Sequence, residues 1–183
     1  MNESQPRKYV LLDRDGTIMI DKGYQKDPAL TELFPNALEG MKTLYDAGYG
    51  LVMVTNQSGI GRGYLSAADL EAVNASLGKI MAAEGVKFDG IYFCPHVPGD
   101  NCDCRKPQPG MVSQATRELH FDPRDAVVVG DRDCDIELGI ASGTRTVLVR
   151  TGGGLETERK HRSNPDYTAD DLMDAARWII ANI

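Results

Sequence analysis

The most constraining feature of this chain is the stretch of residues 9–17, where an apolar run passes directly into acidic and small residues. Residues 9–12 show no polar alternation, which is typical of a parallel strand buried on both faces. Asp13 and Asp15 follow, and two carboxylates two residues apart on an extended chain project to the same side. Their repulsion calls for a cation or a shared proton. The stretch predicts a functional site at a strand end, with a helix-capping pair of aspartates as the structural alternative.

Four further apolar runs have the length of strands, at residues 51–54, 91–93, 126–129 and 146–149. Apolar residues recur at helical spacing within residues 38–45, 70–81, 111–119, 136–140 and 172–180. Ser66 with Asp69, and Thr168 with Asp171, have the spacing of helix caps, and residues 18–31 are expected to form a loop. Strands that alternate with helices predict an α/β fold: a doubly wound, Rossmann-like parallel sheet in a single domain over residues 1–183.

Composition and charge limit the possible partners. The 183 residues include 42% hydrophobic ones and carry a formal net charge of −7, which disfavours a nucleic acid or an anionic membrane as partner. No apolar run approaches the roughly 20 residues of a membrane span. The polar residues 1–8 lack the apolar core of a signal peptide, so a cytoplasmic location is expected, with a monomer as the default state.

Polar residues follow the predicted strands at their carboxyl ends, where ligands bind in doubly wound sheets. Asp13, Thr55, Cys94 and Asp131 all occupy such positions. With Asp15, the aspartates form an all-oxygen cluster of the kind that Mg²⁺ prefers. Bound magnesium in turn points to a small phosphorylated substrate.

The same residues can perform phosphoryl transfer. Asp13 is placed to attack as a nucleophile and form an aspartyl-phosphate. Asp15 can donate a proton to the leaving group and then take one from water. Thr55, the main-chain amides near Asn56 and the cation Lys106 can stabilise the transferred group, although a solvated surface lysine is the alternative for Lys106.

A second constellation contains four soft or borderline metal ligands within eleven residues, namely Cys94, His96, Cys102 and Cys104. Three thiolates and an imidazole suit a closed tetrahedral Zn²⁺ site that stiffens a loop. A disulfide or free thiols are the alternatives. Cys134 is interpreted as a residue at the start of a helix. His120 and His161 are interpreted as solvated side chains.

The segments LLDRDGTI, VTNQSG, RKP and VVVGDRDCDI occur in this order over most of the chain. Together they resemble the four motifs of the haloacid dehalogenase superfamily of phosphohydrolases. By this resemblance Asp13 is the nucleophile and Asp15 the general acid and base. Thr55 and Lys106 would stabilise the phosphoryl group.

The resemblance also implies a Mg²⁺ site. The ion would be held by the carboxylate of Asp13, the main-chain carbonyl of Asp15, and Asp131, with Asp135 orienting its water ligands. The short spacing between VTNQSG and RKP leaves no room for a large cap domain. The chain therefore resembles the capless members of the family, with a loop stapled by zinc.

Within the family, the Cys/His loop resembles two groups, which act on sugar bisphosphates and on histidinol phosphate. The segments 21–24, 56–63 and 106–111 resemble the first group. The five-residue spacer between His96 and Cys102, and the triplet 130–132, resemble the second. We give the first group more weight, because short spacers also occur in it.

The resemblance implies a set of substrate-binding residues: Asp21, Gly23, Tyr24, Asn56, Gln57, Ser58, Arg105 and Lys106. Ser58 stands where the histidinol-phosphate group commonly has an aspartate. Arg132 stands where a lysine is common in the sugar-bisphosphate group, which leaves its role open.

Two other classes of function share part of this pattern. A nucleic-acid 3′-phosphatase would have similar aspartate and threonine elements, but it would need a basic groove that an acidic chain does not suggest. A non-enzymatic phosphoacceptor or a zinc-stapled binding module would also be doubly wound. It would not need Asp15, Thr55 and Lys106 together.

Overall fold

A parallel sheet of six strands is the centre of the computed structural model, which describes residues 7–183. The strands are β1 (Tyr9–Leu12), β2 (Gly50–Asn56), β3 (Gly90–Cys94), β4 (Ala126–Gly130), β5 (Arg145–Val149) and β6 (Tyr167–Ala169), in the order β3-β2-β1-β4-β5-β6. The first and fourth strands are neighbours in space, so the chain changes direction across the sheet at β1. The ends of β1, β2 and β4 therefore flank a crevice of the kind in which doubly wound sheets bind ligands.

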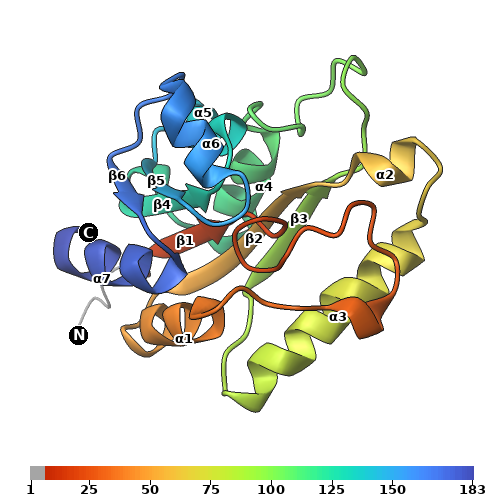
Figure 1. Cartoon of the computed structure of the whole chain (residues 1–183). Helices are drawn as coiled ribbons and strands as arrows, with labels where there is room; N and C mark the ends of the chain where they lie inside the picture. Colours follow the sequence, from red (N-terminus) through yellow and green to blue (C-terminus); the bar gives the residue numbers. More distant parts are fainter. Residues whose placement is uncertain (1–6) are drawn as a thin grey trace.

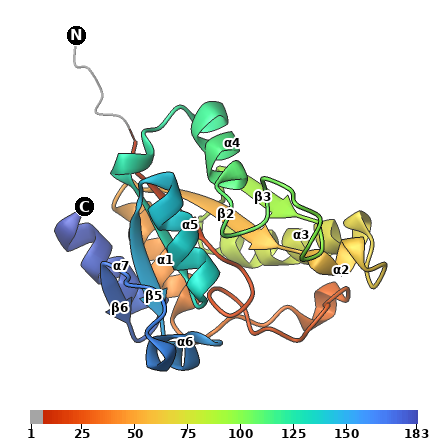
Figure 2. The same ribbon diagram turned by 90° about the horizontal axis from the view of Figure 1, so that it is seen from above.

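Helices cover both faces of the sheet (Figures 1 and 2). They are α1 (Ala37–Asp46), α2 (Ser58–Gly61), α3 (Ala67–Ala83), α4 (Gly110–Leu119), α5 (Asp133–Ser142), α6 (Gly154–Lys160) and α7 (Leu172–Asn182), with one-turn 3-10 helices η1 (Pro28–Leu30) and η2 (Pro123–Asp125). Apolar residues of α1, α3 and α7 pack in one core cluster, and those of α4 and α5 pack in a second cluster on the opposite face. This arrangement confirms the predicted doubly wound fold.

Strand β1 contributes to both cores, because successive side chains point to opposite faces. Val10 and Leu12 belong to the first cluster, whereas Tyr9 and Leu11 belong to the second. All four are buried, which explains the absence of polar alternation in this run. The strand thus fixes the start of the Asp13 segment in the middle of the molecule.

All five predicted strands and all five predicted helices lie within observed elements. Ser66 and Asp69 form the expected capping box at the start of α3. Thr168 was wrongly assigned to a cap: it lies in β6, a sixth strand that was not predicted, and Asp171 alone caps α7 through the main-chain N–H of Asp174. The short helices α2 and α6 were also not predicted.

Helix α5 buries only one of the two isoleucines from which the helix was predicted. Ile136 is buried, but Ile140 is 59% exposed. The buried face runs through Leu138 and Gly139, where a Cβ atom on Gly139 would lie 2.3 Å from a methyl group of Thr146. Gly139 therefore allows α5 to lie close to β5.

The segments that connect the strands form the surroundings of the crevice. Residues 13–36, between β1 and α1, contain only the single turn η1, and residues 95–109, between β3 and α4, contain no helix or strand. In the described residues these two connections are therefore loops, which agrees with the resemblance to capless members of the family. Within the same part of the chain, no helix has both the length and the apolar character needed to cross a membrane. Residues 1–6 of the segment examined for a signal peptide lie outside the described residues.

Candidate active site

Three buried carboxyl groups meet at the carboxyl end of the sheet. Asp13 follows β1, Asp131 follows β4, and Asp135 lies in the first turn of α5. Each offers a carboxylate oxygen within 4.8 Å of the others. Among residues 7–183, no hydrogen-bond donor reaches the buried Oδ1 atom of Asp131. An all-oxygen donor set with an unpartnered buried oxygen fits a hard cation such as Mg²⁺.

Burial makes two of these carboxyl groups, those of Asp13 and Asp131, difficult to ionise without such a cation. It raises the pKa of Asp13 to about 6, although Lys106 opposes the shift. Burial, reinforced by the charge of Asp13, raises the pKa of Asp131 to about 7. A bound divalent cation would favour the ionised forms of both groups.

Glycine is required where the first motif approaches this cluster. Gly16 has a φ of +96°, and a Cβ atom on it would lie 2.3 Å from Oδ2 of Asp131. The same Oδ2 atom accepts a hydrogen bond of 2.7 Å from the main-chain N–H of Gly153. The turn after Asp15 therefore fits tightly over Asp131, and only glycine fits at position 16.

Lys106 is buried, and its side chain contacts the carboxyl cluster instead of the solvent. Its Nζ atom lies 2.7 Å from Oδ1 of Asp13 and 2.6 Å from Oδ1 of Asp135, and it donates to the main-chain oxygen of Val54 at 3.1 Å. Burial opposes the charged form, but Asp13 and Asp135 raise the pKa of Lys106 above its usual range. The side chain of Asn56 exchanges two hydrogen bonds with the main chain of Lys106. The alternative of a solvated surface lysine is therefore wrong.

Asp135 has contacts beyond those implied by the family motif. Besides its ion pair with Lys106, it accepts a hydrogen bond of 3.0 Å from the main-chain N–H of Arg132. Its carboxylate thus links the start of α5 to the buried lysine. Orientation of metal-bound water by Asp135 stays a prediction.

Asp15 is held by its neighbour Arg14 and by Gln57, which follows β2. Its Oδ2 atom accepts hydrogen bonds of 2.8 Å from both Gln57 and Arg14, and Gln57 also donates to the hydroxyl of Thr55 at 2.9 Å. Arg14 is buried and donates to the side-chain oxygen of Asn74 at 2.9 Å. Burial raises the pKa of Asp15, against the lowering effect of Arg14.

A cavity of about 380 Å³ opens in front of these groups. It brings together all the predicted catalytic and substrate residues as lining residues: Asp13, Asp15, Asp21, Gly23, Tyr24, Thr55, Asn56, Gln57, Ser58, Arg105 and Lys106. Arg132 and Asp135 also line it, whereas Asp131 lies fully buried. Cys134, interpreted as a helix-start residue, begins α5 as expected but also lines this cavity.

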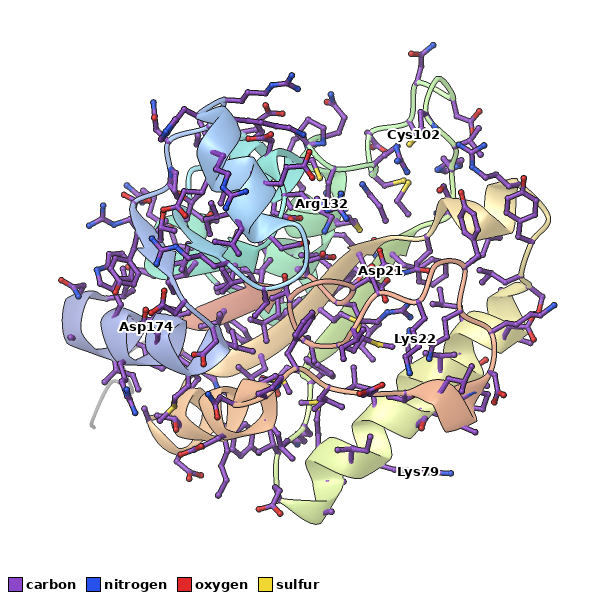
Figure 3. All side chains as sticks on the ribbon, viewed as in Figure 1. Asp21, Lys22, Lys79, Cys102, Arg132 and Asp174 are labelled. Atoms are coloured by element: carbon purple, nitrogen blue, oxygen red, sulfur yellow. The ribbon has the colours of Figure 1, made fainter. Side chains whose placement is uncertain are left out.

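Four further lining side chains, each charged or aromatic, come from three loops: Asp21, Tyr24, Arg105 and Arg132. Arg105 donates to the main-chain oxygen of His96 at 3.1 Å, and the partly exposed Arg132 lies 3.3 Å from Asp131. Tyr24 is half-exposed and its ring packs against Tyr64 at a centroid distance of 4.7 Å. Figure 3 labels Asp21 and Arg132 on two of these loops, together with Cys102 on a third.

The Cys/His constellation forms a compact group beside the cavity. The donor atoms of Cys94, His96, Cys102 and Cys104 all lie within 4.8 Å of one another. The Nδ1 atom of His96 is 3.2 Å from Sγ of Cys104 and 3.5 Å from Sγ of Cys94. All the cysteines of the described chain are free, so the disulfide alternative is not adopted. Three thiols and an imidazole in this arrangement fit a tetrahedral Zn²⁺ site.

Sequence reasoning missed Arg14, Asn74 and Tyr64. An arginine between two aspartates gives no signal of burial, and Asn74 lies on a helix predicted from its apolar spacing alone. His120 and His161 are exposed, as expected.

Comparison with known proteins agrees with this geometry. The model of the HAD-hydrolase-like family matches residues 103–175. The D-glycero-beta-D-manno-heptose-1,7-bisphosphate 7-phosphatase of Pasteurella multocida is 39% identical over 94% of this chain and 97% of its own length, and that of Escherichia coli K12 is 38% identical over 93% and 92%. The crystal structure of the D,D-heptose 1,7-bisphosphate phosphatase from B. bronchiseptica, complexed with magnesium and phosphate, is 32% identical with a TM-score of 0.91 and covers 96% of this chain and 99% of that one.

The fold and the site thus define a phosphatase of the haloacid dehalogenase type. More narrowly, the chain belongs to the family of D-glycero-beta-D-manno-heptose-1,7-bisphosphate 7-phosphatases.

Proposed function

We propose that this enzyme removes the 7-phosphate of D-glycero-D-manno-heptose 1,7-bisphosphate through an aspartyl-phosphate on Asp13. The observation that carries the proposal is the ion pair of 2.7 Å between Lys106 and Asp13 at the base of the cavity. It combines a nucleophilic carboxylate with a fixed cation for the transferred group. The names of the relatives support the choice of substrate.

The reaction has two steps, each with a role for Asp15. A carboxylate oxygen of Asp13 attacks phosphorus, the bond from phosphorus to the sugar oxygen breaks, and Asp15 gives its proton to that oxygen. Asp15 then takes a proton from water, whose oxygen attacks phosphorus and releases Asp13 and phosphate. The ammonium of Lys106 and the hydroxyl of Thr55 donate to the phosphoryl oxygens throughout.

Asp13, the main-chain carbonyl of Asp15, and Asp131 would hold Mg²⁺, with Asp135 beside them. When bound, the cation would neutralise part of the negative charge on the phosphoryl group. The unpartnered Oδ1 of Asp131 supports this assignment.

The contacts of the cavity lining indicate which groups remain for the substrate. The side chains of Asn56 and Gln57 already bond to the main chain of Lys106 and to Asp15. The main-chain N–H of Gln57 also donates to the main-chain oxygen of Cys94 at 2.7 Å, so the main-chain N–H of Asn56 is the group that we assign to the sugar phosphate. Arg105 and the main-chain amide of Ser58 would bind the second phosphate.

Three further lining residues remain for the sugar hydroxyls and ring: Asp21, Gly23 and Tyr24. The main-chain N–H of Gly23 already donates to Asp21 at 2.9 Å, which shapes this part of the loop. An aromatic ring and a carboxylate at the cavity suit a polyhydroxylated substrate.

We also propose one structural Zn²⁺ in the Cys/His loop. Because Arg105 and Lys106 directly follow Cys104, a metal there would fix the start of the segment that reaches the cavity. We further propose a cytoplasmic monomer that acts without nucleic acid or membrane, in lipopolysaccharide heptose biosynthesis.

Measurement of kcat/KM on the heptose 1,7-bisphosphate and on histidinol phosphate tests the proposed substrate. We expect the bisphosphate to be preferred, and Arg105→Ala to reduce kcat/KM more for it than for a monophosphate. Equal or greater activity on histidinol phosphate would contradict the proposal.

A further inference from the structure

We infer that Asn74 and Arg14 are positioning residues for Asp15, and that with Gln57 they select the carboxyl oxygen that carries the proton. The inference rests on the proposed function, because it concerns the two proton transfers assigned to Asp15. Neither Asn74 nor Arg14 lines the cavity. They would act through Asp15 without touching the substrate.

Arg14 is in an unusual environment for an arginine, since only 1% of it is exposed. Burying a guanidinium is costly unless its charge and its N–H groups are paired. Its Nε atom donates to both oxygens of Asp15, at 3.1 and 3.2 Å, and its Nη2 atom donates to Oδ2 at 2.8 Å. The remaining nitrogen, Nη1, donates to Asn74. All three nitrogens of the guanidinium are therefore engaged.

Asn74 is the polar exception on the buried side of α3. The other buried residues of this helix are apolar: Leu70, Val73, Leu77 and Met81. The side-chain oxygen of Asn74 accepts the 2.9 Å hydrogen bond from Arg14, sixty positions earlier in the chain. A rigid helix thus holds one end of the guanidinium plane while Asp15 holds the other. Loss of the Asn74 oxygen would leave Arg14 free to rotate about its contact with Asp15.

The two oxygens of Asp15 differ in their hydrogen bonds. Oδ2 accepts two strong ones at 2.8 Å, from Arg14 and from Gln57. Oδ1 accepts only the 3.1 Å hydrogen bond from Nε of Arg14 in the described residues. Protonation at Oδ2 would disturb two good hydrogen bonds, so Oδ1 is the oxygen that gives and takes the proton. A displaced Arg14 would remove this distinction.

A comparison of rates on two substrates distinguishes proton transfer to the leaving group from the other steps. The sugar phosphate has a leaving oxygen that must be protonated, whereas p-nitrophenyl phosphate releases a stable anion. We expect Asn74→Leu, which keeps the side-chain size and removes the acceptor, to lower kcat on the sugar phosphate about 10-fold to 100-fold, with KM within about 2-fold of wild type.

With p-nitrophenyl phosphate, Asn74→Leu should release a burst of about one nitrophenolate per active site, followed by slow turnover. The burst counts active sites, so partial unfolding cannot imitate the effect on rate. Asn74→Asp keeps an oxygen acceptor for Arg14 and should restore most of kcat. Ser76→Ala on the same helix removes a 3.0 Å hydrogen bond to the main chain of Pro28 and should match wild type.

The inference is wrong if kcat of Asn74→Leu stays within about 2-fold of Ser76→Ala, or if its burst falls in proportion to its turnover. A failure of Asn74→Asp to restore kcat would also overturn it. The proposed function fails separately if the wild-type enzyme and Asp13→Asn release phosphate equally from the sugar phosphate.

Discussion

The Nζ atom of Lys106 lies 2.7 Å from Oδ1 of Asp13, although the two residues are 93 positions apart. The contact joins the end of the central strand β1 to the loop that carries the Cys/His group. It is buried, and Lys106 also pairs with Asp135. The charges of this site therefore depend on one another, and a change in one residue should alter both stability and activity.

Replacement of the buried cation should show this dependence. Lys106→Met would leave Asp13 and Asp135 buried without a counter-charge. We expect the free energy of unfolding, measured in urea, to fall by about 3–5 kcal/mol. Activity should fall at least about 100-fold. Lys42→Met breaks the exposed pair with Asp46 and should change stability by less than about 0.5 kcal/mol. Similar stability losses in both variants would contradict the buried pairing.

A second prediction concerns the turn over Asp131. Gly16→Ala should weaken Mg²⁺ binding at least about 10-fold, because the added Cβ atom would displace the Asp131 carboxylate. Gly85→Ala is the matched control, since Gly85 also has a positive φ of +73° but has nothing within 4 Å of such a Cβ atom. It should lower stability only. The check is a Mg²⁺ titration of activity and melting temperature, and equal apparent affinities would count against the metal site.

The pH dependence of the effect of Mg²⁺ on stability follows from the raised pKa values. The pKa values of Asp13 and Asp131 are raised to about 6 and about 7. In the metal-free protein the protonated carboxyl groups contribute stability, which is fully present below their unfolded-state pKa and is lost as the pH rises through these folded-state values. Mg²⁺ binds the ionised forms. The rise in Tm on adding Mg²⁺ should therefore be larger at about pH 8 than at about pH 5. Thermal melts at both pH values test this, and an equal or opposite difference would refute it.

The Cys/His group should contain one zinc ion per chain in protein purified without added metal. Cys102→Ser and Cys104→Ser should lower zinc content and Tm, and should reduce activity through displacement of Arg105 and Lys106. Cys134 lies outside the Cys/His group, so the Cys134→Ser variant should retain the zinc ion. Elemental analysis with thermal melts provides the measurement. Folded, fully active protein without zinc would show that the cysteines are free thiols.

Much of the site was predictable because parallel strands bring their carboxyl ends to one edge of the sheet. Asp13 and Asp131 directly follow β1 and β4, and Thr55 lies near the end of β2, which pairs with β1, so local patterns sufficed to place them together. The fold was predictable because the strands are short runs rich in apolar residues, although Ile91 and Phe93 of β3 are exposed. The short edge strand β6 has a mixed composition and gave no such signal.

The residues that were missed depend on tertiary contacts. Asn74 has the spacing of a core residue on α3, and only its contact with Arg14 shows why a polar side chain is buried there. Gln57 was predicted at the site and lines the cavity, but the hydrogen bonds of its side chain to Asp15 and Thr55 were not predicted. No local pattern distinguishes these roles from their alternatives.

The covalent intermediate is the centre of the proposed mechanism, and rapid acid quench with phosphate-labelled substrate tests it most directly. With labelled p-nitrophenyl phosphate, whose leaving group needs no proton, Asp15→Asn should lose about 10²–10⁴ in turnover and accumulate label on the protein, because water is no longer activated. Asp13→Asn should be inactive and carry no label. Hydroxylamine should release the label, as expected for an acyl phosphate. Near-normal turnover in Asp13→Asn, or label that persists in it, would contradict the account.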